Sequence, residues 1–201
     1  MMFQISKNHK IMTIRTTLIA ALVSVCCSTF AQNANPMQLR NQFQREIQAP
    51  DATWMSYYNL AYADLMMILG GAPENTVQPL LDESEKMISK LGNDKTADAS
   101  EVAALKALRY LAMMSVNPQV YGPKHSGDLG NACTTALALN PDNPRAIIIQ
   151  AMFQANMASF MNTQYDPSKD FERAAELLGR QDKDAPGPKW GMEFIQAVSN
   201  R

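Results

Sequence analysis

The sequence predicts an all-α fold: a short α-solenoid of about three helix hairpins with a C-terminal capping helix. Apolar residues recur at helical spacing along most of the chain, and clusters of Pro, Gly and Asn interrupt them. The clearest interruption is Asn140-Pro-Asp-Asn-Pro144. Pro141 ends one helix there, and Pro144 begins the next with Asp142 or Asn143 as its cap. Helix pairs joined so tightly need similar neighbours to bury their apolar faces.

The N-terminus has the order of a secretory signal peptide. Lys7, Lys10 and Arg15 precede the apolar run Leu18 to Cys27, and Ser-Thr-Phe-Ala31 follows. We therefore expect cleavage after Ala31 and a protein exported to the periplasm or secreted. Met12 is as good a start as Met1. This run of ten residues, of which only Ser24 is polar, forms a helix of ~15 Å, about half of a bilayer core, so no stable membrane insertion is expected after cleavage.

Lipidation at Cys26 or Cys27 is the alternative to a freely exported chain. Val23-Ser-Val25 precedes Cys26, which is a poor match to the small residue and upstream leucine expected at such a site. Cleavage after Ala31 would leave Cys133 as the single cysteine of the mature chain. That excludes a disulfide within the mature chain, and we expect Cys133 to be a buried apolar residue.

The net charge of the mature chain does not favour binding to nucleic acid. Removing Lys7, Lys10 and Arg15 from the 18 Lys and Arg leaves 15 against 19 Asp and Glu, a net charge of −4. A mildly acidic chain of this kind is not expected to bind nucleic acid or anionic lipid.

The helices follow in order after the signal segment at 1–31. A leader and short helix, residues 32–50, precede a repeat domain at 51–200. In its first half we expect a helix capped by Asp51 that stops at Gly70-Gly71, and a second helix from about Thr76 with Pro79 in its first turn. Asp98 to Glu101 has capping-box spacing and begins the second hairpin.

In the second half of the repeat domain, the sequence predicts longer connections between helices. A loop is expected from Gln119 to Asp128 before the returning helix, and another from Asn156 to Tyr165. Asp166-Pro167 begins the last helix of the third hairpin. After a Pro- and Gly-containing linker, residues 190–198 form a short helix whose apolar face closes the end of the stack.

The hairpins resemble tetratricopeptide repeats, which favour bulky, small and aromatic residues at set positions. The matching residues are Trp54 in the first hairpin, Ala107, Tyr110, Ala136 and Pro141 in the second, and Ile147, Ala151, Phe171 and Ala174 in the third. Trp54, Ala103 and Ile147 lie 49 and 44 residues apart, beyond the usual repeat of about 34, so the repeats must contain insertions.

The chain is also similar to small secreted tetratricopeptide-like proteins of Gram-negative bacteria, over roughly residues 36–200. The similar runs are Trp54-Met-Ser-Tyr-Tyr58, Tyr121-Gly-Pro123, Asn140-Pro-Asp-Asn-Pro-Arg145 and Pro188-Lys-Trp-Gly191. This resemblance implies no known catalytic activity.

The sequence offers little for catalysis or metal binding. His125 and Cys133 are the only histidine and cysteine that follow the signal segment. Eight residues on one helix separate them by ~12 Å, beyond the reach needed to activate a nucleophile. They are too few for a structural zinc site. We expect no catalytic residue, no metal and no cofactor; an enzyme of unrecognised type is the least favoured alternative.

The favoured function is recognition of a protein or peptide partner. First helices of such repeats line a concave groove that can accept an extended peptide or a helix. Positions on those helices predict the lining: Met55, Asn59, Tyr62, Leu108, Arg145, Met152 and Asn156. The alternatives are that these residues are core, or that the protein self-associates, as a homodimer, through Trp190 and the last helix.

Overall fold

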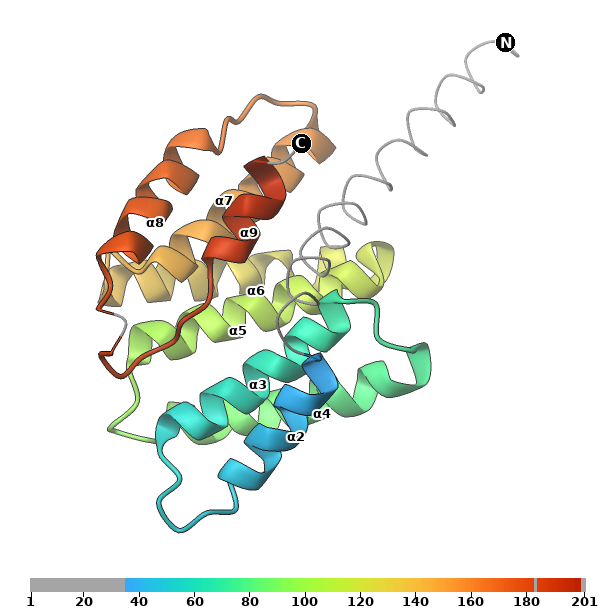
Figure 1. Cartoon of the computed structure of the whole chain (residues 1–201). Helices are drawn as coiled ribbons and strands as arrows, with labels where there is room; N and C mark the ends of the chain where they lie inside the picture. Colours follow the sequence, from blue (N-terminus) through green and yellow to red (C-terminus); the bar gives the residue numbers. More distant parts are fainter. Residues whose placement is uncertain (1–34, 183, 200–201) are drawn as a thin grey trace.

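The computed structural model describes residues 35–182 and 184–199, and within these ranges it contains helices and no strand (Figure 1). The predicted all-α class is therefore confirmed. The helices are α2 (Pro36–Glu46), α3 (Trp54–Leu69), α4 (Glu74–Gly92), α5 (Ala99–Val116), α6 (Pro118–Leu139), α7 (Pro144–Met161), α8 (Ser168–Arg180) and α9 (Met192–Ser199). The predicted signal peptide and the lipidation alternative lie outside the described residues.

Six of the helices form three consecutive hairpins. α3 pairs with α4, α5 with α6, and α7 with α8, while α3, α5 and α7 also pack against one another in that order (Figure 1). α4 in turn contacts α5, and α6 contacts α7. The first helices of the hairpins thus lie side by side, and α2 packs against α3 at the N-terminal side.

Two of the predicted helix caps are confirmed. The carboxylate of Asp98 accepts hydrogen bonds from the backbone N–H groups of Ser100 and Glu101, and the amide oxygen of Asn143 accepts them from Arg145 and Ala146. Both caps satisfy donors that the first turn of a helix leaves unpaired.

The other predicted helix starts differ from the structure. α3 begins at Trp54, after Thr53, so Asp51 is not its cap. α4 begins at Glu74 and carries Pro79 inside the helix rather than in its first turn. Tertiary packing stabilises α4 despite the lost hydrogen bond, since Leu80, Leu81 and Met87 are buried against the core.

The two predicted long connections are mostly helical. Gln119 to Asp128 belongs to α6, which starts at Pro118 with Asn117 as cap and contains Pro123. Its first turns pack on α5, where His125 stacks on Tyr110 with ring centroids 5.4 Å apart. α7 likewise runs to Met161, so only residues 162–167 connect it to α8. Packing against a neighbouring helix outweighs the helix-breaking tendency of the Pro and Gly residues.

The last helix packs against the last hairpin and also reaches the first. After α8 the chain turns back, and α9 contacts α8 and is drawn in front of α7 (Figure 1). The hydroxyl of Tyr62 on α3 donates to Glu193 on α9 at 2.6 Å, although 131 residues separate the two. We refer to residues 184–199 as the C-terminal segment, and to the side of α3, α5 and α7 that it covers as the first-helix face.

Candidate functional site

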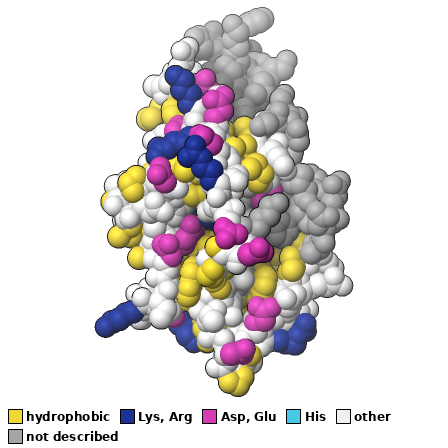
Figure 2. All heavy atoms as spheres, turned by 60° about the vertical axis from the view of Figure 1, so that its left-hand side comes forward, with side chains coloured by type: hydrophobic (Ala, Val, Ile, Leu, Met, Phe, Trp, Pro, Cys, Tyr) yellow, Lys and Arg dark blue, Asp and Glu magenta, His cyan; other side chains and the backbone are white. Residues whose placement is uncertain are grey.

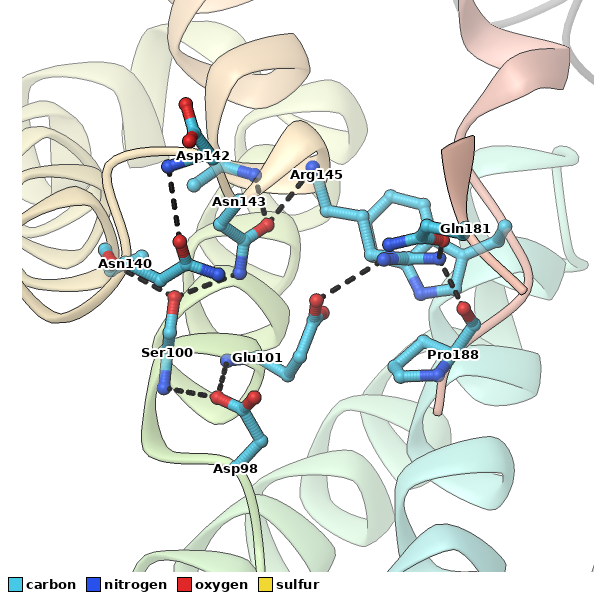
Figure 3. Close-up of polar contacts among 12 residues, drawn as sticks. Asp98, Ser100, Glu101, Asn140, Asp142, Asn143, Arg145, Gln181 and Pro188 are labelled. Carbon is cyan, nitrogen blue, oxygen red and sulfur yellow. Dashed lines mark hydrogen bonds and ion pairs between the residues drawn. The ribbon is translucent and has the colours of Figure 1, made fainter. Parts of the chain in front are cut away.

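Arg145 is the centre of a buried polar network on the first-helix face (Figure 3). Its guanidinium pairs with Glu101 of α5 at 3.1 Å and donates to the side-chain oxygen of Gln181 at 3.1 Å and to the carbonyl oxygen of Pro188. The Arg145 side chain is 0 % exposed. Arg suits this position because its fixed fork of donors reaches several acceptors at once. The network thereby connects α5, α7 and the C-terminal segment.

An aromatic cluster extends the network to α3. The indole N–H of Trp190 donates to the Tyr58 hydroxyl at 3.0 Å, and the Trp190 ring stacks on Tyr62 with centroids 5.0 Å apart. Arg145 lies 5.5 Å from the same indole ring, and Phe194 packs at 5.6 Å. Trp190 is therefore held on several sides by α3, α7 and its own segment.

Burial sets the protonation of this network. Burial raises the pKa of Glu101, an effect that the nearby Arg145 charge opposes. The pKa of the Tyr58 phenol lies well above its usual value because the ring is buried and Glu101 lies close by. Tyr58 is thus a neutral donor to Glu101 at 3.4 Å. A charged pair removed from water in this way costs desolvation, which good geometry and further hydrogen bonds offset.

The starts of α5 and α7 hold Glu101 and Arg145 in register. Asn143 donates to the Ser100 hydroxyl at 2.8 Å, and Ser100 donates to the carbonyl oxygen of Ala136 at 2.8 Å (Figure 3). The cap of one helix is therefore bonded to the first turn of another. This arrangement brings the two charged side chains of the following residues together.

The residues predicted to line a concave groove lie in different environments. Leu108, Arg145, Met152 and Tyr62 are buried, whereas Met55, Asn59 and Asn156 are half-buried. Tyr62 and Arg145 do contact a peptide segment, but that segment belongs to the same chain. Because Tyr62 and Arg145 contact the C-terminal segment, a second molecule can reach these two side chains only if that segment moves.

Sequence reasoning missed the partners of Arg145 and Tyr62. Glu101 was assigned to a capping box, yet its side chain pairs with Arg145 rather than with the backbone of Asp98. Trp190 was considered for self-association as an alternative, yet it is only 5 % exposed and packs within its own chain. The unusual run Pro188-Lys-Trp-Gly191 was the available signal, because an aromatic residue in a linker needs a surface to cover it.

Comparison with known proteins gives one informative match. The fold is similar to the solved structure of the HusA haemophore from Porphyromonas gingivalis, with a TM-score of 0.70, 23% sequence identity and coverage of 92% of each chain. The likeness shows the fold. No protein-family model matches the chain, and no curated protein sequence matches significantly.

A second feature of the surface is a group of exposed apolar side chains where α5 and α7 end. Phe160 is 77 % exposed and Met161 58 %, and Val116 and Val120 are also exposed around the turn between α5 and α6. We call these four residues the apolar end surface. α5 and α7 run side by side in the same direction, since their starts are bonded together, so all four residues lie at the same end of the hairpins.

His125 and Cys133, the two residues considered for nucleophilic chemistry, lie in different environments. Burial raises the pKa of the Cys133 thiol to about 12, so it is not a thiolate at neutral pH. His125 pairs with Asp128 at 3.0 Å, and its Nε2 is buried with no hydrogen-bond partner among residues 35–182 and 184–199. In that part of the chain no three His, Cys, Asp or Glu side chains gather at a metal-binding distance.

The charge of the surface is mixed. On the face drawn in Figure 2, Lys and Arg side chains are interspersed with Asp and Glu side chains, with apolar atoms between them. Among the described helices, none combines the length and apolarity needed to cross a bilayer.

Proposed function

We propose that this protein is an exported, non-catalytic binding protein whose ligand is haem or a similar planar, apolar molecule. The observation that carries the proposal is the likeness in fold to a haemophore across 92% of both chains. The signal-like N-terminus supports export, because a haemophore must meet its ligand outside the cytoplasm.

The apolar end surface is the proposed binding site. A porphyrin presents a wide apolar face and an edge with two carboxylates, so a suitable protein surface combines aromatic or thioether side chains with a nearby cation. Phe160 and Met161 supply the first requirement. Lys124 supplies the second, because it is exposed and lies one helical turn after Val120 on α6.

The experiment is a haem titration of residues 32–201, followed by absorbance. We expect saturable binding at a defined stoichiometry for the unchanged protein. Phe160→Ser should weaken the affinity by about 10-fold or more, because a buried phenylalanine contributes about 2 kcal/mol or more. Leu139→Ser is the matched control, since Leu139 is 56 % exposed but lies at the opposite end of α6. Equal losses in both variants, or binding that does not saturate, would contradict the proposal.

A second candidate function is binding of a protein or peptide through the first-helix face. We propose that the three hairpins stack in the manner of tetratricopeptide repeats, because α3, α5 and α7 lie side by side while α4 and α6 each contact the next first helix. Met55, Asn59 and Asn156 remain partly accessible along these helices. The specific observation in favour is that this face already holds a peptide segment of the same chain.

A further inference from the structure

The contacts between the first-helix face and the C-terminal segment have the form of peptide recognition. Three side chains of the face receive three different features of the segment. Arg145 donates to the Pro188 carbonyl oxygen, Tyr58 and Tyr62 hold the Trp190 indole, and Tyr62 donates to the Glu193 carboxylate. Trp190 and Phe194 are 5 % and 1 % exposed, as anchor residues of a bound peptide would be.

The covalent link to the rest of the chain contacts the segment through Lys189, whose ammonium donates to the carbonyl oxygens of Asp182 and Ala185. Residues 184–186 are exposed, and Gly187 and Gly191 have φ values of +156° and +130°. Gly191 is required in this conformation, because a Cβ there would lie 3.1 Å from Leu178 and 3.2 Å from Ile148. The segment therefore docks through residues 188–198, while an exposed linker joins it to α8.

We propose that the C-terminal segment is a built-in ligand that blocks a peptide-binding face, and that a segment of a partner protein can replace it. The partner segment is defined by the contacts above. It carries an indole, a carboxylate three residues later and an aromatic ring directly after the carboxylate, in the spacing of Trp190, Glu193 and Phe194. A segment tethered by a short linker acts at an effective concentration in the millimolar range, so a partner must compete against it. This inference rests on the peptide-binding function proposed for the first-helix face, and it does not depend on haem binding.

The test uses the full chain with a protease site in place of residues 184–186. After cleavage, the probe is a fluorescent peptide of residues 187–198, and its binding is followed by anisotropy. We expect the peptide to bind the cleaved protein at least ~100-fold more tightly than the intact protein, because cleavage removes the tether. The Trp190→Ala peptide should lose about 10-fold or more in affinity, since it lacks the central aromatic anchor.

A matched protein variant separates recognition from folding. Tyr62→Phe keeps the ring that stacks on Trp190 and removes the hydroxyl that donates to Glu193. We expect a several-fold weaker peptide affinity with unchanged circular dichroism. A Glu193→Gln peptide should bind unchanged Tyr62 protein with a similar loss.

Three outcomes would overturn the proposal. If the cleaved segment can be removed only with loss of helical circular dichroism, the segment is part of the fold and not a replaceable ligand. Equal affinity of intact and cleaved protein would place peptide binding elsewhere. Exchange of segments between two copies, seen as dimers by light scattering in preference to peptide binding, would make a second copy the occupant.

Discussion

At the scale of single residues, the sequence did not indicate that the charged side chain of Arg145 is buried. Arg145 follows directly after a turn of Asn, Asp and Pro, and its position on the first helix of the third hairpin predicted contact with a partner. Its acceptors Glu101 and Pro188 lie 44 and 43 residues away. Contacts between residues so far apart in the sequence produce no pattern within one helix. The role of Arg145 is therefore seen only in the folded structure.

Asp64 is a second buried acidic residue, located on α3, against which α2 packs. Its Oδ1 accepts from Arg40 of α2 at 2.6 Å, and its Oδ2 has no hydrogen-bond partner among the described residues. Arg40 also pairs with Glu83 of α4. Burial raises the pKa of Asp64 from 3.8 to about 7, against the opposing effect of Arg40.

This pKa predicts a pH dependence of stability. The folded state holds the Asp64 proton more tightly than the unfolded state, so the stabilisation is complete below pH 4 and is lost as the pH rises to about 7. Asp64→Asn keeps an acceptor for Arg40 and removes the titration. We expect the variant to be more stable at pH 8 by on the order of 2–4 kcal/mol, since each pKa unit corresponds to about 1.4 kcal/mol.

Urea unfolding at pH 4.5, 6 and 8 measures the effect. Glu46→Gln on the exposed side of α2 is the control, and its stability should follow the unchanged protein. Parallel stability curves for Asp64→Asn and the unchanged protein across this range would show that Asp64 does not titrate there.

At the scale of helices, the cap of α7 illustrates how one element positions the next. Asn143 is 0 % exposed, caps α7 and donates to Ser100 at the start of α5. Asn35 makes the same kind of cap for α2, but it is exposed, and its side chain accepts from the backbone N–H of Met37 in its own helix. The two asparagines therefore separate the local effect of a cap from its tertiary effect.

We expect Asn143→Ala to destabilise the protein by about 2 kcal/mol or more. The substitution removes the cap of α7 and also removes the buried donor that the Ser100 hydroxyl accepts from. Asn35→Ala should cost at most about 1 kcal/mol, the effect of an exposed cap alone. Thermal and urea unfolding measure both. Similar losses in the two variants would show that the bond to Ser100 contributes nothing.

The sequence predicted the helices well and their lengths less well. Helical spacing of apolar residues located every described helix, Asp98 was identified as a cap, and Asn143 was one of the two residues expected to cap α7. Gln119 to Asp128 was assigned to a loop because Pro and Gly residues are helix breakers in isolation. Contacts with α5 override that preference, and a single sequence does not contain those contacts.

At the scale of the molecule, the C-terminal segment converts three hairpins into one unit with a covered face. The sequence located the first-helix face but left its occupant open. Trp190 meets Tyr58 across 132 residues, a separation that periodicity cannot detect. The expected binding residues Tyr62 and Arg145 thus lie on a face that a segment of the same chain covers.

The fluorescence of Trp190 tests this arrangement most directly. Trp54 and Trp190 are the two tryptophans of the chain, so Trp54→Phe leaves Trp190 as the only reporter. Because Trp190 is 5 % exposed, the folded variant should emit at short wavelength and resist quenching by acrylamide until it unfolds. Emission at long wavelength and easy quenching in the folded protein, as in the unfolded chain, would show that the C-terminal segment does not cover the first-helix face.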